Sequence, residues 1–231
     1  MQKINPNLSI NSFFCDFSVQ DSIRKCADKI KNDLKAIDLL INNAGVVNTE
    51  YSETIDGIEN TFAVNHLGYF LFTNLLLDLV KKESESRIIN VSSAAHHFVK
   101  GMQWDDINYK DDFKMGLKAY GQSKLGNILF TKQLAKKLQK DGVTVNAIHP
   151  GGVNTSLGNQ NNSLLGRVLK IILKPFFRSP LKGANTIIYL AEIDGLSITG
   201  AYWVDGRVAK TSHYSKTVSY THLRAHETGP Y

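Results

Sequence analysis

The chain has 231 residues, of which 42% are hydrophobic and 21% charged, and its formal net charge is +6. This length fits one α/β domain with a substantial core, and the composition is that of an ordinary globular protein. The basic residues are scattered without a long run, which argues against a nucleic-acid partner, and a cleft for a phosphate-bearing cofactor would account for the excess equally well. The only cysteines, Cys15 and Cys26, predict a reducing compartment and no disulfide framework. No stretch approaches the roughly 20 apolar residues of a membrane span.

Strands and helices are predicted to alternate along the chain. Short apolar runs predict strands over residues 10–17, 37–41, 87–91, 143–149 and 200–204. Helices are predicted from residue 18 to about 33, from 55 to about 82, over 117–140, and from 179 to about 191. Ser18 and Asp21 have the spacing of a capping box, and Ser179 with Pro180 reads as an N-cap followed by an N1 proline. This order predicts a parallel sheet covered by helices on both faces.

Polar clusters follow several of these strands, where ligands of such sheets bind. They comprise Asp16, residues 42–45, Ser92 with Ser93, and residues 150–155. The helix over residues 117–140 also carries Tyr120 and Lys124 four residues apart, and therefore on one face.

A nearby cation can convert such a tyrosine into a proton donor and acceptor. Lowering a tyrosine pKa from about 10 to about 7 needs roughly 4 kcal/mol, which a charge at about 4 Å supplies in an effective dielectric near 20. The pair Tyr120 and Lys124 therefore predicts proton transfer to a carbonyl or alcohol oxygen. An ordinary surface pair on a helix is the alternative, and the other motifs of the chain decide against it.

Together these motifs resemble the short-chain dehydrogenase/reductase family over about residues 10–205. Asn42-Asn43-Ala44-Gly45 is similar to the family's NNAG motif, and the turn over residues 150–155 is similar to its PG turn. The catalytic set of the family is matched in chain order by Asn65, Ser93, Tyr120 and Lys124. Four further features resemble the retinol dehydrogenase-like branch of this family. They are residues 64–68 (VNHLG), residues 87–93 with His96-His97 after them, residues 123–127 (SKLGN) and the long interval from Ser93 to Tyr120.

The resemblance implies a role for each catalytic position. Tyr120 would donate a proton to the carbonyl oxygen, and Ser93 would hydrogen-bond the same oxygen, whereas Ser92 would be structural. Lys124 would lower the Tyr120 pKa and hold ribose hydroxyls. Asn65 would open its helix locally and hold a water that relays protons to Lys124, with a plain capping or kink residue as the alternative.

The resemblance also implies a nicotinamide cofactor, NADP, with NAD as the alternative. Asp16 would meet the adenine amine, or be a plain turn aspartate. The other implied cofactor-binding residues are Asn43, Ala44, Gly45, Tyr120, Lys124, Pro150, Gly151, Val153 and Thr155.

The implied reaction interconverts a lipophilic alcohol and its aldehyde or ketone, with retinal and related carbonyls as the leading substrate. His96-His97 invites a metal hypothesis, but no further ligand stands at a suitable spacing, so we expect no metal and place the pair at the pocket lip or in a solvated loop. The resemblance implies that residues 164–177 are a substrate lid; the alternative is that they rest on a membrane surface. We expect this chain in the cytoplasm. A complete chain could associate with the endoplasmic reticulum membrane, either through a preceding N-terminus or through residues 164–177. A homo-oligomer is also possible.

The sequence departs from the family at both ends. The TGxxxGxG loop with which the family begins is not found, so we expect a doubly wound Rossmann-like sheet that lacks its first two strands and the glycine-rich loop. These strands would lie between strands 3 and 4 of a sheet ordered 3-2-1-4-5-6-7, so their loss would remove about half of the cofactor cleft. The alternative is therefore an N-terminally truncated, catalytically inactive chain that binds no dinucleotide. Residues 1–211 are expected to form the partial family domain, and residues 212–231 a non-family tail that is either artefactual or naturally disordered.

Overall fold

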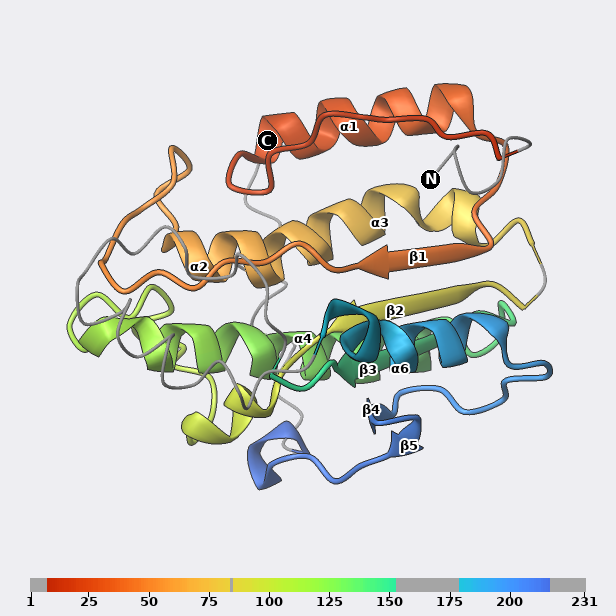
Figure 1. The fold of residues 1–231 in the computed structure, drawn as a ribbon. Coiled ribbons are helices and arrows are strands. Elements are labelled where there is room, and N and C mark those ends of the chain that lie inside the picture. Colours follow the sequence, from red (N-terminus) through yellow and green to blue (C-terminus); the bar gives the residue numbers. More distant parts are fainter. Residues whose placement is uncertain (1–7, 84, 153–178, 217–231) are drawn as a thin grey trace.

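A single five-stranded sheet lies at the centre of the computed structural model, which describes residues 8–83, 85–152 and 179–216 (Figure 1). The strands lie in the order β1-β2-β3-β4-β5; the first four run parallel, and the last pairs antiparallel with its neighbour. Their bounds are β1 Leu39–Asn42, β2 Arg87–Val91, β3 Thr144–His149, β4 Tyr202–Val204 and β5 Arg207–Val208. Four of the five predicted strands are therefore present, and β5 is an addition.

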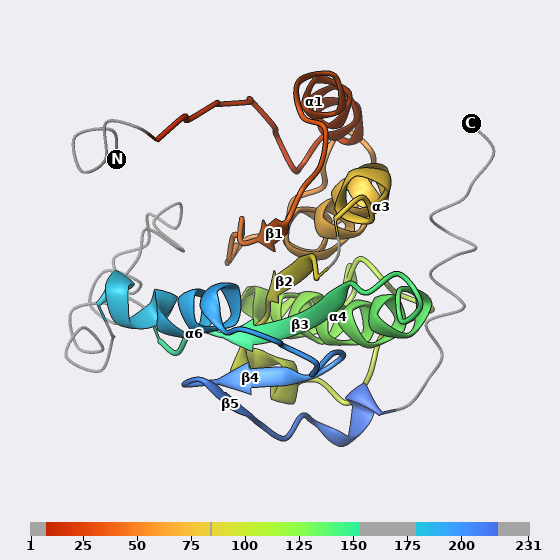
Figure 2. The ribbon, with the colours of Figure 1, turned by 90° about the vertical axis from the view of Figure 1, so that its right-hand side faces the viewer.

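Helices cover both faces of this sheet, as predicted. Figures 1 and 2 show α3 (Gly68–Val80) and α4 (Leu117–Lys137) on one face, α6 (Pro180–Glu192) on the opposite face, and α1 (Gln20–Asp33) packed on α3. The shorter elements are α2 Asn60–Phe62, the π-helical turn η1 Ala63–Leu67, and the 3-10 turns η2 Ala94–Phe98, η3 Lys114–Gly116 and η5 His213–Ser215. The arrangement is that of a doubly wound α/β domain.

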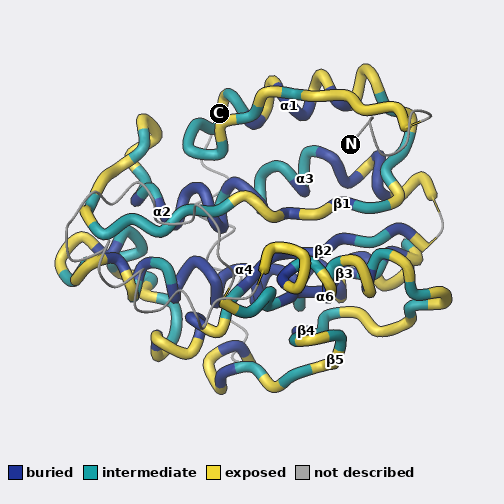
Figure 3. Tube along the Cα trace, in the orientation of Figure 1, coloured by how far each residue is buried: buried dark blue, intermediate teal, exposed yellow. Residues whose placement is uncertain are grey.

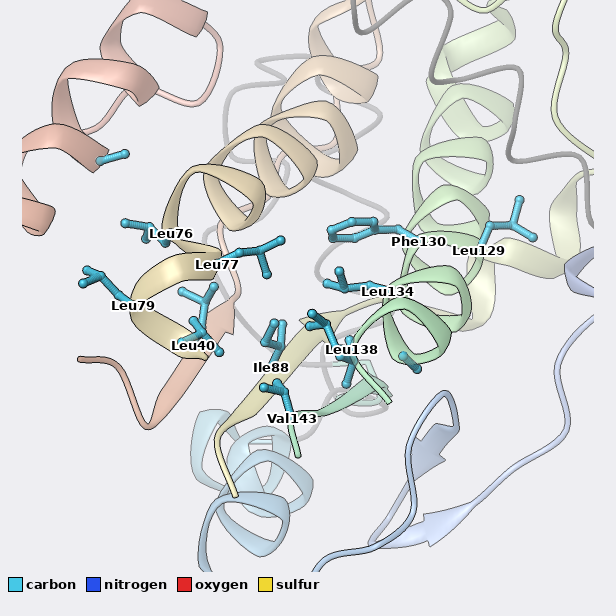
Figure 4. Packing of buried hydrophobic residues seen from close by; sticks show 14 of the residues in the cluster. Leu40, Leu76, Leu77, Leu79, Ile88, Leu129, Phe130, Leu134, Leu138 and Val143 are labelled. Atoms are coloured by element: carbon cyan, nitrogen blue, oxygen red, sulfur yellow. The ribbon is translucent and has the colours of Figure 1, made fainter. Parts of the chain in front are cut away.

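The largest core cluster lies between the sheet and α1, α3 and α4. In Figure 4, Ile88 of β2 packs among leucines of α3 and α4, which include Leu77 and Leu134. The next residue, Ile89, points to the other face and packs with Leu190 of α6. This alternation follows from the two-residue period of a strand and explains why a sheet buried on both faces is apolar at successive positions. Figure 3 shows the result in α4, which is buried along much of its length, whereas the outer side of α1 is exposed.

The strand predicted over residues 10–17 is wrong. The segment is extended but pairs with no strand among the described residues, and an extended segment without a ladder partner is not part of a sheet. Phe14 is 85% exposed, so the apolar run that suggested a buried strand does not enter the core as a whole.

The capping box predicted at Ser18 and Asp21 is also wrong. The Ser18 hydroxyl donates instead to the Asp16 carboxylate, and Val19 occupies the N-cap position. The free N–H of Gln20 donates to the Asp56 carboxylate at 3.0 Å, so a residue distant in sequence caps this helix. A local motif could not reveal that tertiary cap.

The second helical region begins at Asn60, five residues later than predicted. Gly57 has a φ of 72°, which places a turn where the prediction started the helix. The buried carboxylate of Glu59 then caps the helix by accepting hydrogen bonds from the N–H groups of Thr61 and Phe62, both at 2.7 Å. Glutamate is an unusual N-cap, which is why the sequence did not signal this start.

The run Asn60–Val80 is long and apolar enough to cross a membrane by length and composition alone, contrary to the sequence-based expectation that no stretch approaches this limit. Of its most apolar window, 61% is buried inside the fold. The apolar composition of this run is therefore that of a helix buried in the core between two layers.

Candidate active site at the carboxyl ends of the strands

A cavity of about 380 Å³ lies where β1, β2 and β3 end. Eight of the predicted site residues line it: Asn43, Ala44, Gly45, Ser93, Tyr120, Lys124, Pro150 and Gly151. The structure therefore brings together three loops and one helix that are separated by up to about a hundred residues in sequence, at the edge where ligands of parallel sheets bind.

Close packing of α4 against η2 places Tyr120 and Lys124 at this cavity. A Cβ atom on Gly121 would lie 2.8 Å from the carbonyl oxygen of Ala95, so only glycine allows the two backbones to approach this closely. Below the cavity, the Ser92 hydroxyl donates to the carbonyl oxygen of Lys124 at 2.7 Å. Ser92 thus holds α4 against the end of β2, which is the structural role predicted for it.

Lys124 is a buried ammonium group at the floor of the cavity. Its Nζ donates to the carbonyl oxygen of Val91 at 3.2 Å and lies 5.5 Å from the centre of the Tyr120 ring and 5.8 Å from that of Tyr69. Burial lowers the pKa of Lys124 to about 7, because the charged form loses its hydration. The lysine is therefore a group that can gain or lose a proton near neutrality.

Burial raises the pKa of Tyr120 above its ordinary value, and a hydrogen bond with the Ser93 side chain acts in the opposite direction. The predicted lowering of this pKa by Lys124 is not what the structure shows. The prediction assumed a fully charged lysine at about 4 Å, whereas desolvation weakens the charge of Lys124 and also penalises the phenolate. Burial therefore favours the neutral phenol of Tyr120, and the Ser93 side chain partly offsets this effect.

Asn65 lies directly beneath the loop of the NNAG motif. Its amide oxygen accepts from the Val46 N–H at 2.8 Å, and its amide nitrogen donates to the Val46 carbonyl at 2.9 Å and to the Ser123 hydroxyl at 3.2 Å. A Cβ on Gly45 would lie 3.3 Å from the Asn65 amide oxygen, so the loop rests on this side chain. Asn65 lies in the π-helical turn η1, where the helix is locally open, and its carbonyl accepts from Asn127 at 2.9 Å. Its role in a proton relay stays a prediction.

Among the predicted cofactor residues that the structure describes, Asp16 is not brought to the cavity. Asp16 lies in an exposed turn and accepts hydrogen bonds from the N–H and hydroxyl of Ser18, a geometry that matches the alternative of a plain turn aspartate. Val153 and Thr155 lie outside the described residues, as does the segment 164–177.

Several residues that shape the site were not predicted from the sequence. Tyr69 is fully buried, and its hydroxyl donates to the carbonyl oxygen of Ala44 at 2.6 Å, which fixes the NNAG loop from α3. Asn127 joins α4 to β2 by donating to the Val91 carbonyl at 3.1 Å. His149 and four residues of α6 complete the cavity wall: Pro180, Gly183, Ala184 and Ile187. The sequence gives no sign that Tyr69 has this role, because an aromatic residue in an apolar helix is ordinary. Asn127 could have been found, because a polar residue on an apolar helix face indicates a buried hydrogen-bonding role.

The pair His96-His97 does not form a metal site with other described residues. No group of three or more His, Cys, Asp or Glu side chains suited to a metal ion occurs in residues 8–83, 85–152 and 179–216. The His96 ring instead hydrogen-bonds the carbonyl of Ser93, at 2.6 Å.

The residues around the cavity fit a nicotinamide dinucleotide. The backbone of residues 43–45 lines the cavity, and at Gly45 the absence of a Cβ lets this loop lie close to Asn65 and Lys124. Lys124 is a buried donor with one carbonyl partner, so it retains N–H groups for ligand hydroxyl oxygens. A doubly wound sheet with this constellation at the ends of its strands defines the class of Rossmann-like α/β proteins.

Comparison with known proteins identifies the family within this class. A family model described as enoyl-(acyl carrier protein) reductase matches residues 1–206. The chain is 42% identical over 195 residues to mouse retinol dehydrogenase 14, covering 82% of the chain and 57% of that protein. It is 42% identical over 205 residues to human retinol dehydrogenase 13, covering 87% and 61%, and 38% identical over 217 residues to mouse retinol dehydrogenase 11, covering 94% and 67%. The chain thus spans about 57–67% of the length of these relatives.

Solved structures agree with this assignment. An uncharacterised protein from Mycobacterium paratuberculosis superimposes with a TM-score of 0.69 at 28% identity, covering 92% of this chain and 72% of that one. A Pseudomonas aeruginosa RhlG/NADP active-site complex gives a TM-score of 0.61 at 26% identity, covering 81% and 72%. The chain belongs to the short-chain dehydrogenase/reductase family, in its retinol dehydrogenase-like branch.

Proposed function

We propose that the protein is an NADP-dependent oxidoreductase that interconverts a lipophilic alcohol and its aldehyde or ketone, such as retinol and retinal. The observation that carries the proposal is that Ser93, Tyr120 and Lys124 share one cavity with residues 43–45. The retinol dehydrogenases among the relatives support the substrate class, and the NADP complex among the similar structures supports the cofactor.

Tyr120 and Ser93 would act on the substrate oxygen. In the reducing direction Tyr120 donates its phenolic proton to the carbonyl oxygen, and Ser93 stabilises the negative charge that develops there by a hydrogen bond. The Ser93 hydrogen bond that favours the Tyr120 phenolate keeps this loss of a proton accessible despite burial. The reverse transfer accompanies oxidation of the alcohol.

Lys124 would hold the cofactor and return the proton. Its Nζ can donate to ribose hydroxyls while it keeps its bond to Val91, and its pKa of about 7 allows it to pass a proton to the Tyr120 phenolate. The bound nicotinamide supplies or accepts the hydride. Asn65 would hold the loop over residues 43–46 in place beneath the cofactor and take part in the relay to Lys124.

An apolar wall explains why a lipophilic substrate would be preferred. Ile187, Ala184 and Pro180 of α6 face the cavity together with Val91 of β2. Apolar lining with a few polar groups at one end is the usual composition of sites that bind small hydrophobic molecules. Burying an alkyl chain there is worth about 0.8 kcal/mol per CH₂ group.

The alternative is a chain that binds no dinucleotide, which the lack of a TGxxxGxG motif in the sequence favours. A fluorescence titration of the 231-residue chain with NADPH separates the two. Saturable binding is expected, and Lys124→Met should weaken it. Lys118→Met should not, because Lys118 lies on the same helix, does not line the cavity and is paired with Asp112. Absence of saturable binding by the unsubstituted chain would favour the alternative.

A further inference from the structure

The segment over residues 211–216 folds back onto the domain instead of leaving it. Its 3-10 turn η5 is closed by hydrogen bonds from the Ser215 N–H and hydroxyl to the Ser212 carbonyl. Lys132 of α4 donates to the carbonyl oxygen of Ser215 at 2.9 Å. A boundary after residue 211, as expected from sequence, would therefore divide a set of contacts that the structure joins.

His96 connects this segment to Ser93. Its Nδ1 lies 2.6 Å from the Ser93 carbonyl oxygen, and its Nε2 lies 3.2 Å from the backbone nitrogen of Ser212. A carbonyl can only accept and a backbone N–H can only donate, so Nδ1 carries the proton and Nε2 is the acceptor. The ring is completely buried and contacts Tyr202 edge-on at 5.1 Å between ring centres. Both ring nitrogens and the ring plane are thus fixed.

The conformation of Ser93 depends on the same turn. Its hydroxyl oxygen accepts from the Ala95 N–H at 3.2 Å, and its carbonyl accepts from both the backbone N–H and the ring of His96. With the Ala95 N–H occupying one lone pair, the hydroxyl proton of Ser93 is left for the cavity side, where it meets the side chain of Tyr120. The turn η2 therefore determines where Ser93 directs its hydrogen bond.

We propose that His96 is a positioning residue for Ser93, and that residues 211–215 complete the candidate active site by holding His96 as its Nδ1–H tautomer. The inference rests on the proposed function for the importance of Ser93, but the tautomer itself is independent of any activity. Without the Ser212 N–H, the ring could rotate or exchange its proton between the two nitrogens. The Ser93 carbonyl would then lose its shortest hydrogen bond, and the Ser93 hydroxyl its fixed direction.

A proline at position 212 removes the N–H that matters, together with the Ser212 hydroxyl, and places its ring Cδ where that N–H pointed at His96. Ser212 has φ −57° and ψ 154°, values that proline adopts without strain, and its carbonyl bonds to Ser215 remain available. Ser212→Ala is the matched control, because it removes the hydroxyl and keeps the N–H. The imidazole nitrogens are observed by NMR in the full chain, and turnover of retinal with NADPH is measured alongside.

In the unsubstituted chain and in Ser212→Ala, His96 should be the neutral Nδ1–H tautomer. In Ser212→Pro, this preference and the amide shift of Ala95 should change, and kcat should fall roughly tenfold relative to Ser212→Ala with KM within about twofold. An unchanged tautomer in Ser212→Pro, or an unchanged kcat in an active enzyme, would overturn the inference. If no form of the chain turns over, the proposed function fails, and the NMR result alone decides the inference.

A second variant covers the case in which Ser212→Pro does not fold. His96→Phe keeps the ring packed against Tyr202 and deletes both hydrogen bonds. The altered Ala95 amide and the selective fall in kcat are again expected. A lower melting temperature with kcat and the Ala95 amide unchanged would show that His96 is merely structural.

Discussion

Replacing Gly126 by alanine tests how tightly α4, the helix that carries Tyr120 and Lys124, must approach η1. A Cβ on Gly126 would lie 2.9 Å from Cγ and Nδ1 of His66 and 3.0 Å from Cδ2. The ring has little room to yield, because it is fully buried, its Nδ1 lies 2.9 Å from the Asn127 amide oxygen, and it lies 5.1 Å from the Phe62 ring between centres. The substitution therefore forces apart two elements of the site.

Two opposing effects decide whether Gly126→Ala raises or lowers the free energy of unfolding. Alanine is favoured over glycine in a helix interior by about 1 kcal/mol, whereas overpacking a rigid core costs about 1–3 kcal/mol. With three ring atoms of His66 at or below 3.0 Å, we expect the upper part of that range and a net loss of about 1–2 kcal/mol. For a domain of this size each kcal/mol lowers the melting temperature by about 2–4 °C.

The assay is urea unfolding of a double-mutant cycle with His66→Ala. In the His66→Ala background the ring is absent, so Gly126→Ala should be neutral or stabilising, because only the helix propensity remains. A Gly126→Ala single variant as stable as the parent chain would refute the packing argument. Equal destabilisation in both backgrounds would show that the loss has a cause other than contact with His66.

Two further predictions concern stability. Burial lowers the pKa of His66 and of His96 to about 4 from the ordinary 6.5. Between these two pH values the unfolded chain binds protons that the folded chain does not. The free energy of unfolding should therefore fall by roughly 3 kcal/mol per histidine as the pH drops from about 6.5 to 4. Urea midpoints across this range should flatten in His66→Gln and His96→Gln, and a flat profile in the parent chain would contradict the burial argument. Glu59→Ala should cost about 1–2 kcal/mol in urea unfolding because Thr61 and Phe62 lose their cap, and Glu59→Gln, which keeps one acceptor oxygen, should cost less; equal losses would show that the cap is not responsible.

Strands β2 and β3 were largely predictable because their residues are buried on both faces. The bounds of β2 were predicted without error, since Arg87–Val91 contains two isoleucines and a valine directly after a polar segment. Residues 10–17 have a similar apolar content, but they have no partner strand among the described residues and stay outside the sheet. Pairing is a tertiary property, and a local pattern does not contain it.

The site was predictable where chemistry limits the choice of residue. Ser93, Tyr120 and Lys124 carry groups that few other side chains replace, and the structure places all three at one cavity. The supports behind them were not predictable. Tyr69 and His96 hold the loop and the turn of the site by contacts that reach across the fold, and nothing in their sequence neighbourhoods indicates those contacts.

Electrostatics was the least predictable property of the site. A helical spacing of four residues correctly placed Lys124 beside Tyr120, but the sign of the shift in the Tyr120 pKa depended on burial. Desolvation acts on both groups at once, and it can only be assessed once the surrounding walls are known. The proton-transfer hypothesis therefore relies on the Ser93 hydrogen bond more than the sequence indicated.

The most direct test of the account is turnover by Tyr120→Phe. Reduction of retinal by NADPH should fall by about 100-fold or more, because the proton donor is lost, while the affinity for NADPH stays within about threefold of the parent chain, because Lys124 and the loop over residues 43–45 are unchanged. Turnover by Tyr120→Phe close to that of the parent chain would contradict the assignment of Tyr120 as the proton donor.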